Sequence, residues 1–86
     1  MAIAVARRFG ENLLRCRKTA GLSQEQLGLR AGLHRTEIGL LERGARVPRV
    51  DTLMKLSAAL DISPHDLLDG ITWEPGDTQR GHFELS

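Results

Sequence analysis

Apolar side chains recur with helical spacing over most of the chain. Phe9, Leu13 and Cys16 follow one another at intervals of four and three residues, which places them on one face of a helix from about residue 3 to 19. Gly21 is typical of a helix end. A capping box then begins at Ser23, whose hydroxyl is expected to bind the backbone of Gln26 while Gln26 reaches back. The pattern predicts a second helix over residues 24–31.

A third short helix follows almost at once. It is expected from about residue 35 to 43, with Ile38 and Leu41 facing inward and Gly44 ending it. The second helix would bury Leu27 and Ala31. Only about three residues, beginning with the glycine at position 32, connect these two helices. Two helices joined by so short a turn cross steeply, which is the arrangement of a helix-turn-helix.

Two further helices are predicted after Pro48. The fourth ends before Asp61, an expected left-handed residue, and Ser63, Pro64 and Asp66 supply an N-cap, a first-position proline and a first-turn acid for a fifth helix to about residue 68. The side chains expected to line the inward face of the fourth helix are Val50, Leu53, Leu56, Ala59 and Leu60.

From residue 70 onward the spacing changes to alternation. Apolar and polar residues alternate on both sides of the turn at residues 75–77, which predicts a hairpin of two short strands or an extended tail. The apolar positions are Ile71, Trp73, Phe83 and Leu85. Two strands are marginally stable alone, so this face must pack on the helical body or on a second chain. The predicted fold is therefore all-α, with a helical domain over residues 1–69 and a β-like extension over residues 70–86.

Composition narrows the class of protein. The chain has 86 residues, of which 41% are hydrophobic and 27% charged, so it is expected to form one small domain and not a multidomain enzyme. No apolar run approaches the ~20 residues of a membrane span, and Arg7 and Arg8 interrupt the start before a secretory core could form. A cytoplasmic, nucleoid-associated protein is expected.

Catalytic and metal-binding patterns are weak. Cys16 is the single cysteine, so no internal disulfide can form, and its place on an apolar helical face favours a core residue over a nucleophile. The histidines at positions 34, 65 and 82 are too far apart for a local metal motif. No spacing indicates a nucleophile elbow, a pair of catalytic carboxylates or a glycine-rich phosphate loop. We therefore expect no enzymatic activity, no metal and no cofactor.

The charges are distributed unevenly along the chain. Residues 1–49 contain ten of the twelve Lys and Arg and four of the eleven Asp and Glu, a net charge of +6, whereas residues 50–86 have a net charge of −5. A basic half on a nearly neutral domain favours binding to nucleic acid or another anionic surface. The alternative is a solvated surface of uneven composition.

One stretch of the chain resembles a known family. Residues 13–68 contain Gly-Leu-Ser-Gln-Glu-Gln-Leu at positions 21–27, Gly-Leu at 32–33, Leu-Glu-Arg-Gly at 41–44 and Pro48. This sequence resembles the Xre-like helix-turn-helix family of phage repressors and Cro proteins. The resemblance implies a five-helix repressor-like DNA-binding domain, with the motif at about residues 23–43. It also implies a dimer on a two-fold-related operator, with the third helix in the major groove of double-stranded DNA.

The resemblance also assigns expected roles to single residues. Arg35 could bind O6 and N7 of guanine, Thr36 could meet a thymine methyl group or a phosphate, and Leu40 offers an apolar contact. His34 stands beside them, and Gly39 is expected to be exposed with this group. Gln24 matches a position that contacts phosphate at the start of the second helix, where backbone N–H groups also favour an anion.

Further arginines are expected at the DNA backbone. Arg43, Arg46 and Arg49 match the loop that runs beside the phosphates, although a solvated charged face is the alternative. Arg17 and Glu42 match positions that form a partly buried ion pair between the first helix and the end of the third. The acidic residues at positions 61, 66 and 69 should face away from DNA.

The expected function is a sequence-specific transcriptional regulator. Its dimer interface is expected to include Ile71, Trp73, Phe83 and Leu85, with Trp73 folding back on its own fourth and fifth helices as the competing arrangement. The alternative function is a protein-interaction module, such as an antitoxin or adaptor on the same scaffold. A small enzyme is a third possibility that no motif favours.

Overall fold

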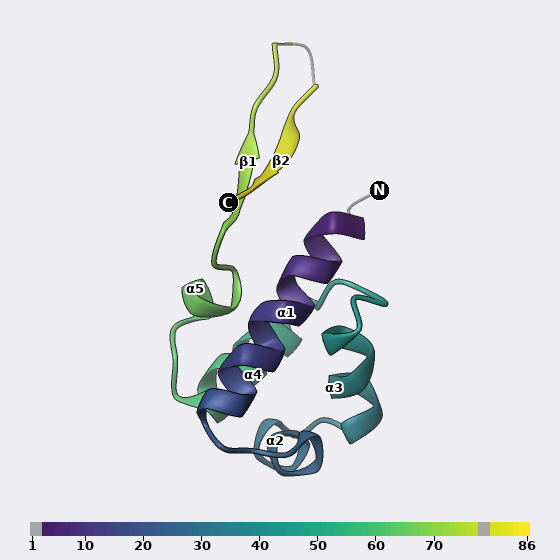
Figure 1. The fold of residues 1–86 in the computed structure, drawn as a ribbon, viewed down its shortest axis with the longest axis vertical. Helices are drawn as coiled ribbons and strands as arrows, with labels where there is room; N and C mark the ends of the chain where they lie inside the picture. The colour runs from purple at the N-terminus through teal and green to yellow at the C-terminus, as the bar shows by residue number, and fades with distance from the viewer. Residues whose placement is uncertain (1–2, 78–79) are drawn as a thin grey trace.

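The computed structural model describes residues 3–77 and 80–86, which form a helical body and a projecting hairpin (Figure 1). The helices are α1 (Ile3–Thr19), α2 (Gln24–Ala31), α3 (Arg35–Glu42), α4 (Val50–Leu60) and α5 (Pro64–Leu67), followed by strands β1 (Ile71–Glu74) and β2 (His82–Leu85). The molecule measures 44 × 21 × 20 Å because the hairpin extends beyond the body. The predicted elements are confirmed, except that α3 and α5 each end one residue earlier than expected.

Local hydrogen bonds explain where the helices begin. At the start of α2, Ser23 Oγ accepts a hydrogen bond from Gln26 N at 3.0 Å, and Gln26 Oε1 accepts one from Ser23 N at 2.8 Å. Ser63 and Asp66 form the same reciprocal pair before α5. Asp61 ends α4 in the left-handed conformation, with φ 56°. These contacts agree with the capping predicted from the sequence.

The hydrophobic core lies where α1 packs on α3 and α5 and where α2 packs on α3 and α4. Its buried side chains are Phe9, Leu13, Leu27, Ala31, Ile38, Leu41, Leu56, Leu60 and Leu67. Val50 was expected in this core, but it is 77% exposed. It stands at the first position of α4, one turn before the half-buried Leu53 and outside the part of the helix that its neighbours cover.

A close approach between α1 and α3 depends on Gly10. A Cβ atom at this buried position would lie 2.5 Å from the carbonyl oxygen of Leu41 and 2.6 Å from that of Glu42. Any larger residue would push the end of α3 away from α1. Gly10 therefore allows the contact that brings Arg17 and Glu42 together.

The C-terminal segment is an antiparallel hairpin and not an extended tail. Ile71 pairs with Leu85 and Trp73 with Phe83, so all four apolar side chains share one face. Ile71 and Leu85 are half-buried beside the body, whereas Trp73 is 52% and Phe83 47% exposed. The Trp73 and Phe83 rings meet edge to face, with centroids 4.9 Å apart.

Polar side chains of α1 fix the base of the hairpin. The buried Asn12 donates through Nδ2 to the carbonyl oxygens of Leu67 and Asp69, each at 3.0 Å. Arg8 Nη1 donates to the carbonyl oxygen of Ser86, whose N–H donates to Gly70 O at 2.9 Å. The segment between α5 and β1 is thereby attached to α1, so the hairpin leaves the body in a defined direction (Figure 1).

Candidate nucleic-acid interface

Three helices meet at a nearly buried ion pair. Arg17 Nε lies 2.5 Å from Glu42 Oε2 and Arg17 Nη2 lies 3.0 Å from Glu42 Oε1, with 11% and 5% of the two side chains exposed. Arg17 Nη1 also donates to the carbonyl oxygen of Leu22 at 2.8 Å. The hydrogen bond to Glu42 raises the pKa of Arg17 above its ordinary value. This arrangement connects α1 to the end of α3, as the family position implies.

Gln24 takes part in the same cluster. Its Nε2 donates to Glu42 Oε1 at 2.9 Å, so the side chain joins the start of α2 to the end of α3. A Cβ atom at Gly39 would lie 3.7 Å from Gln24 Oε1 and 3.2 Å from Arg43 Nη1. Gly39 is therefore buried, contrary to the expectation that it is exposed, because these two long side chains cover it.

The first turn of α3 is open to solvent. His34 is the N-cap, and its Nδ1 accepts a hydrogen bond from Thr36 N at 3.0 Å, an interaction that leaves Nε2 facing away from the helix end. Arg35 and Thr36 are exposed, and Leu40, one turn further, is partly exposed. These four side chains thus include three that can donate hydrogen bonds, those of His34, Arg35 and Thr36, and one that offers an apolar contact.

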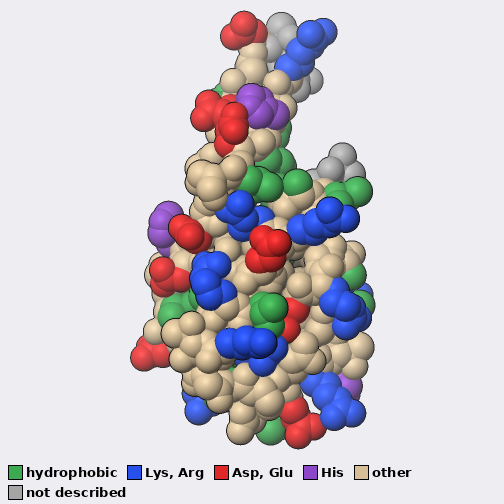
Figure 2. Space-filling view, viewed as in Figure 1, with side chains coloured by type: hydrophobic (Ala, Val, Ile, Leu, Met, Phe, Trp, Pro, Cys, Tyr) green, Lys and Arg blue, Asp and Glu red, His purple; other side chains and the backbone are tan. Residues whose placement is uncertain are grey.

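Exposed arginines border α3. Arg46 lies 3.1 Å from Glu37 and Arg49 lies 3.3 Å from Asp51, with more than half of each arginine side chain exposed. Arg43, the C-cap of α3, forms no ion pair within residues 3–77 and 80–86. Exposed ion pairs are worth about 0–1 kcal/mol, so a phosphate can replace the carboxylate at little cost. On the face shown in Figure 2, most Lys and Arg side chains lie over the body.

Comparisons with known proteins agree with this geometry. The model of the helix-turn-helix family HTH_3 matches residues 13–67, more than half of the chain. The chain belongs to this helix-turn-helix family of DNA-binding transcriptional regulators. The control protein C.BamHI of Bacillus amyloliquefaciens is 42% identical over 65 residues, which cover 74% of this chain and 80% of the relative.

Solved structures show the same fold. The restriction-modification controller protein C.AhdI from Aeromonas hydrophila superposes with a TM-score of 0.72 at 42% identity, covering 74% of this chain and 97% of that one. The P22 c2 repressor, solved in complex with a synthetic operator, superposes with a TM-score of 0.67 at 35% identity, covering 72% of this chain and 94% of the repressor. The family match ends at residue 67, before the hairpin begins.

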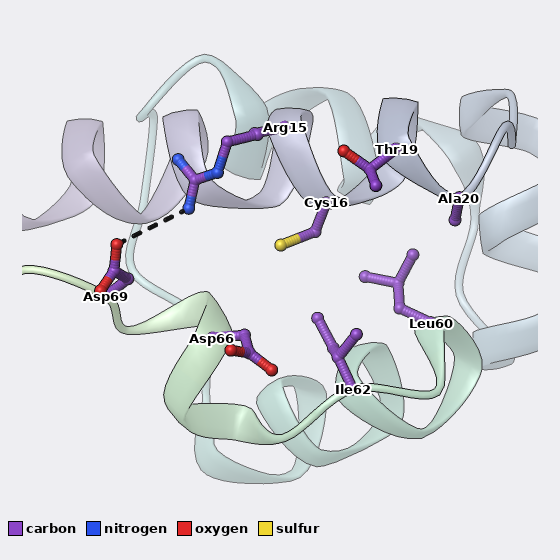
Figure 3. Close-up of a pocket in the computed structure, with 8 residues that line it drawn as sticks. All are labelled: Arg15, Cys16, Thr19, Ala20, Leu60, Ile62, Asp66 and Asp69. Carbon is purple, nitrogen blue, oxygen red and sulfur yellow. Dashed lines mark ion pairs between the residues drawn. The ribbon is translucent and has the colours of Figure 1, made fainter.

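An open groove lies between α1 and the turn from α4 to α5, with a volume of about 560 Å³ (Figure 3). Leu60 and Ile62 form its apolar wall, Arg15 lies 4.0 Å from Asp69 at one end, and the Cys16 thiol points into it. Burial raises the pKa of this thiol; Arg15 opposes the shift and the nearby aspartates add to it. The thiol is thus mostly protonated near neutral pH, which suits a packing role better than a nucleophilic one.

Two of the acidic residues that were expected to face away from DNA, Asp66 and Asp69, lie on the α5 side of the body. Asp66 and Asp69 line the groove between α1 and the turn from α4 to α5, and α5 packs on α1 and α4.

Among the described residues, no helix is long and apolar enough to cross a membrane, and no group of three His, Cys, Asp or Glu is placed to hold a metal ion.

The sequence did not predict the residues that support the candidate DNA-binding surface around α3 by holding other elements or side chains in place. Asn12 and Arg8 hold α5 and the hairpin on α1. Glu25 binds Arg35 at the start of α3, and Glu37 binds Arg46 in the loop after it. Asn12 is four residues before Cys16 and thus shares its helical face, which is an unusual place for an amide. That position was the one signal available, because the partners of Asn12 are more than fifty residues away.

Proposed function

We propose that this protein is a sequence-specific transcriptional regulator that binds a two-fold-related operator as a homodimer, with α3 in the major groove. The observation that carries the proposal is the pairing of an exposed first turn of α3 with a buried anchor at its other end. Arg17 and Glu42 hold α3 on α1, so the side chains of its first turn are presented from a rigid frame. The P22 c2 repressor, which shares this fold and was solved in complex with a synthetic operator, supports the binding of operator DNA.

The proposed contacts with DNA fall into two classes, contacts with bases and contacts with phosphates. Arg35 and Thr36 at the start of α3, with His34 and Leu40 beside them, face the base edges, and Arg35 has the planar fork that fits guanine O6 and N7. The phosphate contacts come from Gln24, Arg43, Arg46 and Arg49, the set that surrounds α3. Phosphate contacts fix the register on DNA, and base contacts determine the sequence.

Gln24 has two tasks in this proposal. Its Nε2 is bound to Glu42, and the backbone N–H groups of Gln24 and Glu25, which the Ser23 cap does not bind, would meet a phosphate. The Gln24 side chain would then fix the position of α2 relative to α3, and the N-terminus of α2 would bind the phosphate.

Selection of bound sequences from a random pool of duplexes is the first test. The wild-type protein should enrich one sequence with two-fold symmetry. Arg35→Ala should lose ~1–3 kcal/mol of binding free energy on that site and relax the preference at one base pair of each half-site. Unchanged preferences at every base pair would contradict the base-reading role of Arg35.

Arg46→Ala is the matched comparison. It removes the same charge from the same surface, but it should weaken binding to every sequence alike and lower the slope of log K against log salt by ~1. If the protein were instead an antitoxin or adaptor that binds another protein through an apolar surface, its affinity for duplex DNA would be negligible and its complex would tolerate salt.

The dimer requires a surface away from α3. One reading helix touches few base pairs, and two half-sites about 34 Å apart give specific affinity when a two-fold dimer spans them. Residues 1–69 serve as the DNA-binding domain in this proposal, and residues 70–86 as the dimerisation element. The exposed edges and apolar face of the hairpin, with Trp73 and Phe83 half-exposed, suit a contact with a second copy.

The proposed ligand, double-stranded DNA, indicates where in the cell the protein acts. A regulator of this kind works in the cytoplasm on chromosomal DNA, and it acts by occupying its site and not by catalysis.

A further inference from the structure

The proposed base-reading arginine has a protein partner. Arg35 Nη1 lies 3.2 Å from Glu25 Oε2, a contact between the first turn of α3 and the first turn of α2. About two thirds of each side chain is exposed, so both groups remain accessible to a ligand. A carboxylate on the surface proposed to face DNA is unexpected, because it repels phosphate.

The shape of the guanidinium group allows two partners at once. Arginine has five N–H donors in one plane, spread over two edges. Glu25 takes a single contact, at Nη1. The edge formed by Nε and Nη2 makes no contact with Glu25, and it has the spacing that binds guanine O6 and N7 together. Glu25 can therefore restrain Arg35 while Arg35 binds a base.

The contact with Glu25 makes binding of Arg35 to a phosphate less favourable than its binding to a base. Without a restraint, the long side chain of Arg35 can turn to any nearby phosphate, and such a contact has no sequence preference. With Glu25 beside it, a phosphate at that place would also approach a carboxylate, which costs Coulomb energy. The restraint thus favours a base contact over a backbone contact.

We propose that Glu25 is a specificity-determining residue that positions Arg35 for a base and disfavours its binding to phosphate. This inference rests on the proposed function, since it needs Arg35 at the DNA surface. It assigns to Glu25 a role that the charge of the surface alone would not give, namely a sequence preference at one base pair.

The chain contains a control of the same kind, Glu37, whose side chain is less exposed than that of Glu25, at 27% against 66%. Glu37 is also an acid in the first turn of its helix, and it pairs with an exposed arginine, Arg46, at 3.1 Å. Arg46 belongs to the proposed phosphate contacts. Replacing Glu37 therefore removes the same charge and the same helix-end interaction as replacing Glu25, but it releases an arginine with no base to read.

The experiment compares Glu25→Ala with Glu37→Ala. Both proteins, with the wild type, are used to select sequences from a random duplex pool, and dissociation constants are then measured on the selected operator, on every single-base variant of one half-site and on unrelated duplex. Thermal midpoints of the two variants establish that both fold. Glu25→Gln, which keeps the shape and an oxygen acceptor but loses the charge, provides a graded intermediate.

The expected result is specific to one position. Glu25→Ala should reduce discrimination at a single base pair by ~2–5-fold, the range of an exposed ion pair, and should raise affinity for unrelated DNA. The base pair affected should be the one that Arg35→Ala also affects. Glu37→Ala should raise affinity for all duplexes by a similar factor and leave the preference at each base pair unchanged.

Other outcomes overturn the inference in distinguishable ways. If both variants raise affinity uniformly with the same preferences as wild type, Glu25 contributes only its charge and the positioning role is wrong. If Glu25→Ala changes neither preference nor affinity, the contact with Arg35 has no function in binding. If the wild-type protein itself selects no sequence, the proposed function fails first and the inference fails with it.

Discussion

The two ends of the body are both attached to α1, but by different chemistry. At the end that presents α3, Arg17 and Glu42 form an ion pair with little solvent around it. At the hairpin end, the neutral amide of Asn12 binds two main-chain carbonyl oxygens. A buried charge that loses its partner is costly, whereas an amide that loses its partners costs only unmade hydrogen bonds. The position of α3 is therefore expected to depend more strongly on a single pair than the position of the hairpin does.

Glu42→Gln should have the largest effect on stability. Arg17 would stay charged in a site where its carboxylate partner is missing, so the free energy of unfolding should fall by ~3–5 kcal/mol. Urea denaturation followed by circular dichroism measures the loss. Operator affinity should fall as well, because the end of α3 loses its attachment to α1.

A double-mutant cycle shows whether the loss belongs to the pair. Arg17→Met alone, Glu42→Gln alone and the two together should give strongly non-additive losses, with the double variant more stable than the sum predicts. Additive losses would mean that the two side chains do not interact in solution, and the contrast between the two ends would disappear.

Much of this contrast could not be predicted from sequence. Caps and turns are local, so the capping box at Ser23 and the left-handed Asp61 placed the helix ends within one residue. The Arg17 and Glu42 positions were suggested by a resemblance and not by any local pattern. Asn12 gave only the signal of an amide on the apolar face of its helix, because its partners lie more than fifty residues away in the sequence.

Burial was also hard to predict where long side chains decide it. Gly39 has no side chain of its own, and its burial comes from Gln24 and Arg43 lying over it. Val50 has the right spacing for the inward face of α4, but no neighbouring element covers the first position of that helix. Spacing gives the face of a helix, and it does not give how far along the helix that face is covered.

Removing the apolar end of the hairpin tests the other region. Trp73→Ala together with Phe83→Ala should give a folded monomer whose operator affinity is lower by ~100-fold or more, because each half-site is then bound without the help of the other. Sedimentation analysis measures the mass, and a binding titration measures the affinity.

Truncation after Gly70 is the corresponding control. It keeps Asn12 and both of its carbonyl partners, so the body should stay folded. A truncated protein that remains a dimer and binds its operator as tightly as the full chain would show that the helices alone form the interface.

Asn12→Ala should have a smaller effect than Glu42→Gln. One buried and one partly buried carbonyl oxygen, those of Leu67 and Asp69, lose their donor, which should lower the free energy of unfolding by ~1–3 kcal/mol. Hydrogen exchange should increase most at the amides of α5 and β1, and least in α2 and α3. A larger loss than that of Glu42→Gln, with exchange increased equally throughout, would reverse the ranking of the two anchors.

The smallest expected effect concerns the Cys16 thiol, whose rate of alkylation reports on the groove beside α5. Since burial raises the pKa of its thiol above the ordinary value of 9.0, less thiolate is present in the folded protein than in the unfolded chain at any pH below that value. Alkylation by iodoacetamide near pH 8 should therefore be slower in the native protein than in urea. The protonated thiol favours the folded state, so this contribution to stability is present at neutral pH and is lost as pH rises through the raised pKa. In Asn12→Ala the native alkylation rate should rise above that of the wild type, because the segment that carries Asp66 and Asp69 at the edge of the groove is held less firmly on α1, whereas in Arg46→Ala the rate should stay at the wild-type value. Equal rates in the native wild type and in urea would mean that the groove beside α5 does not shield Cys16 at all.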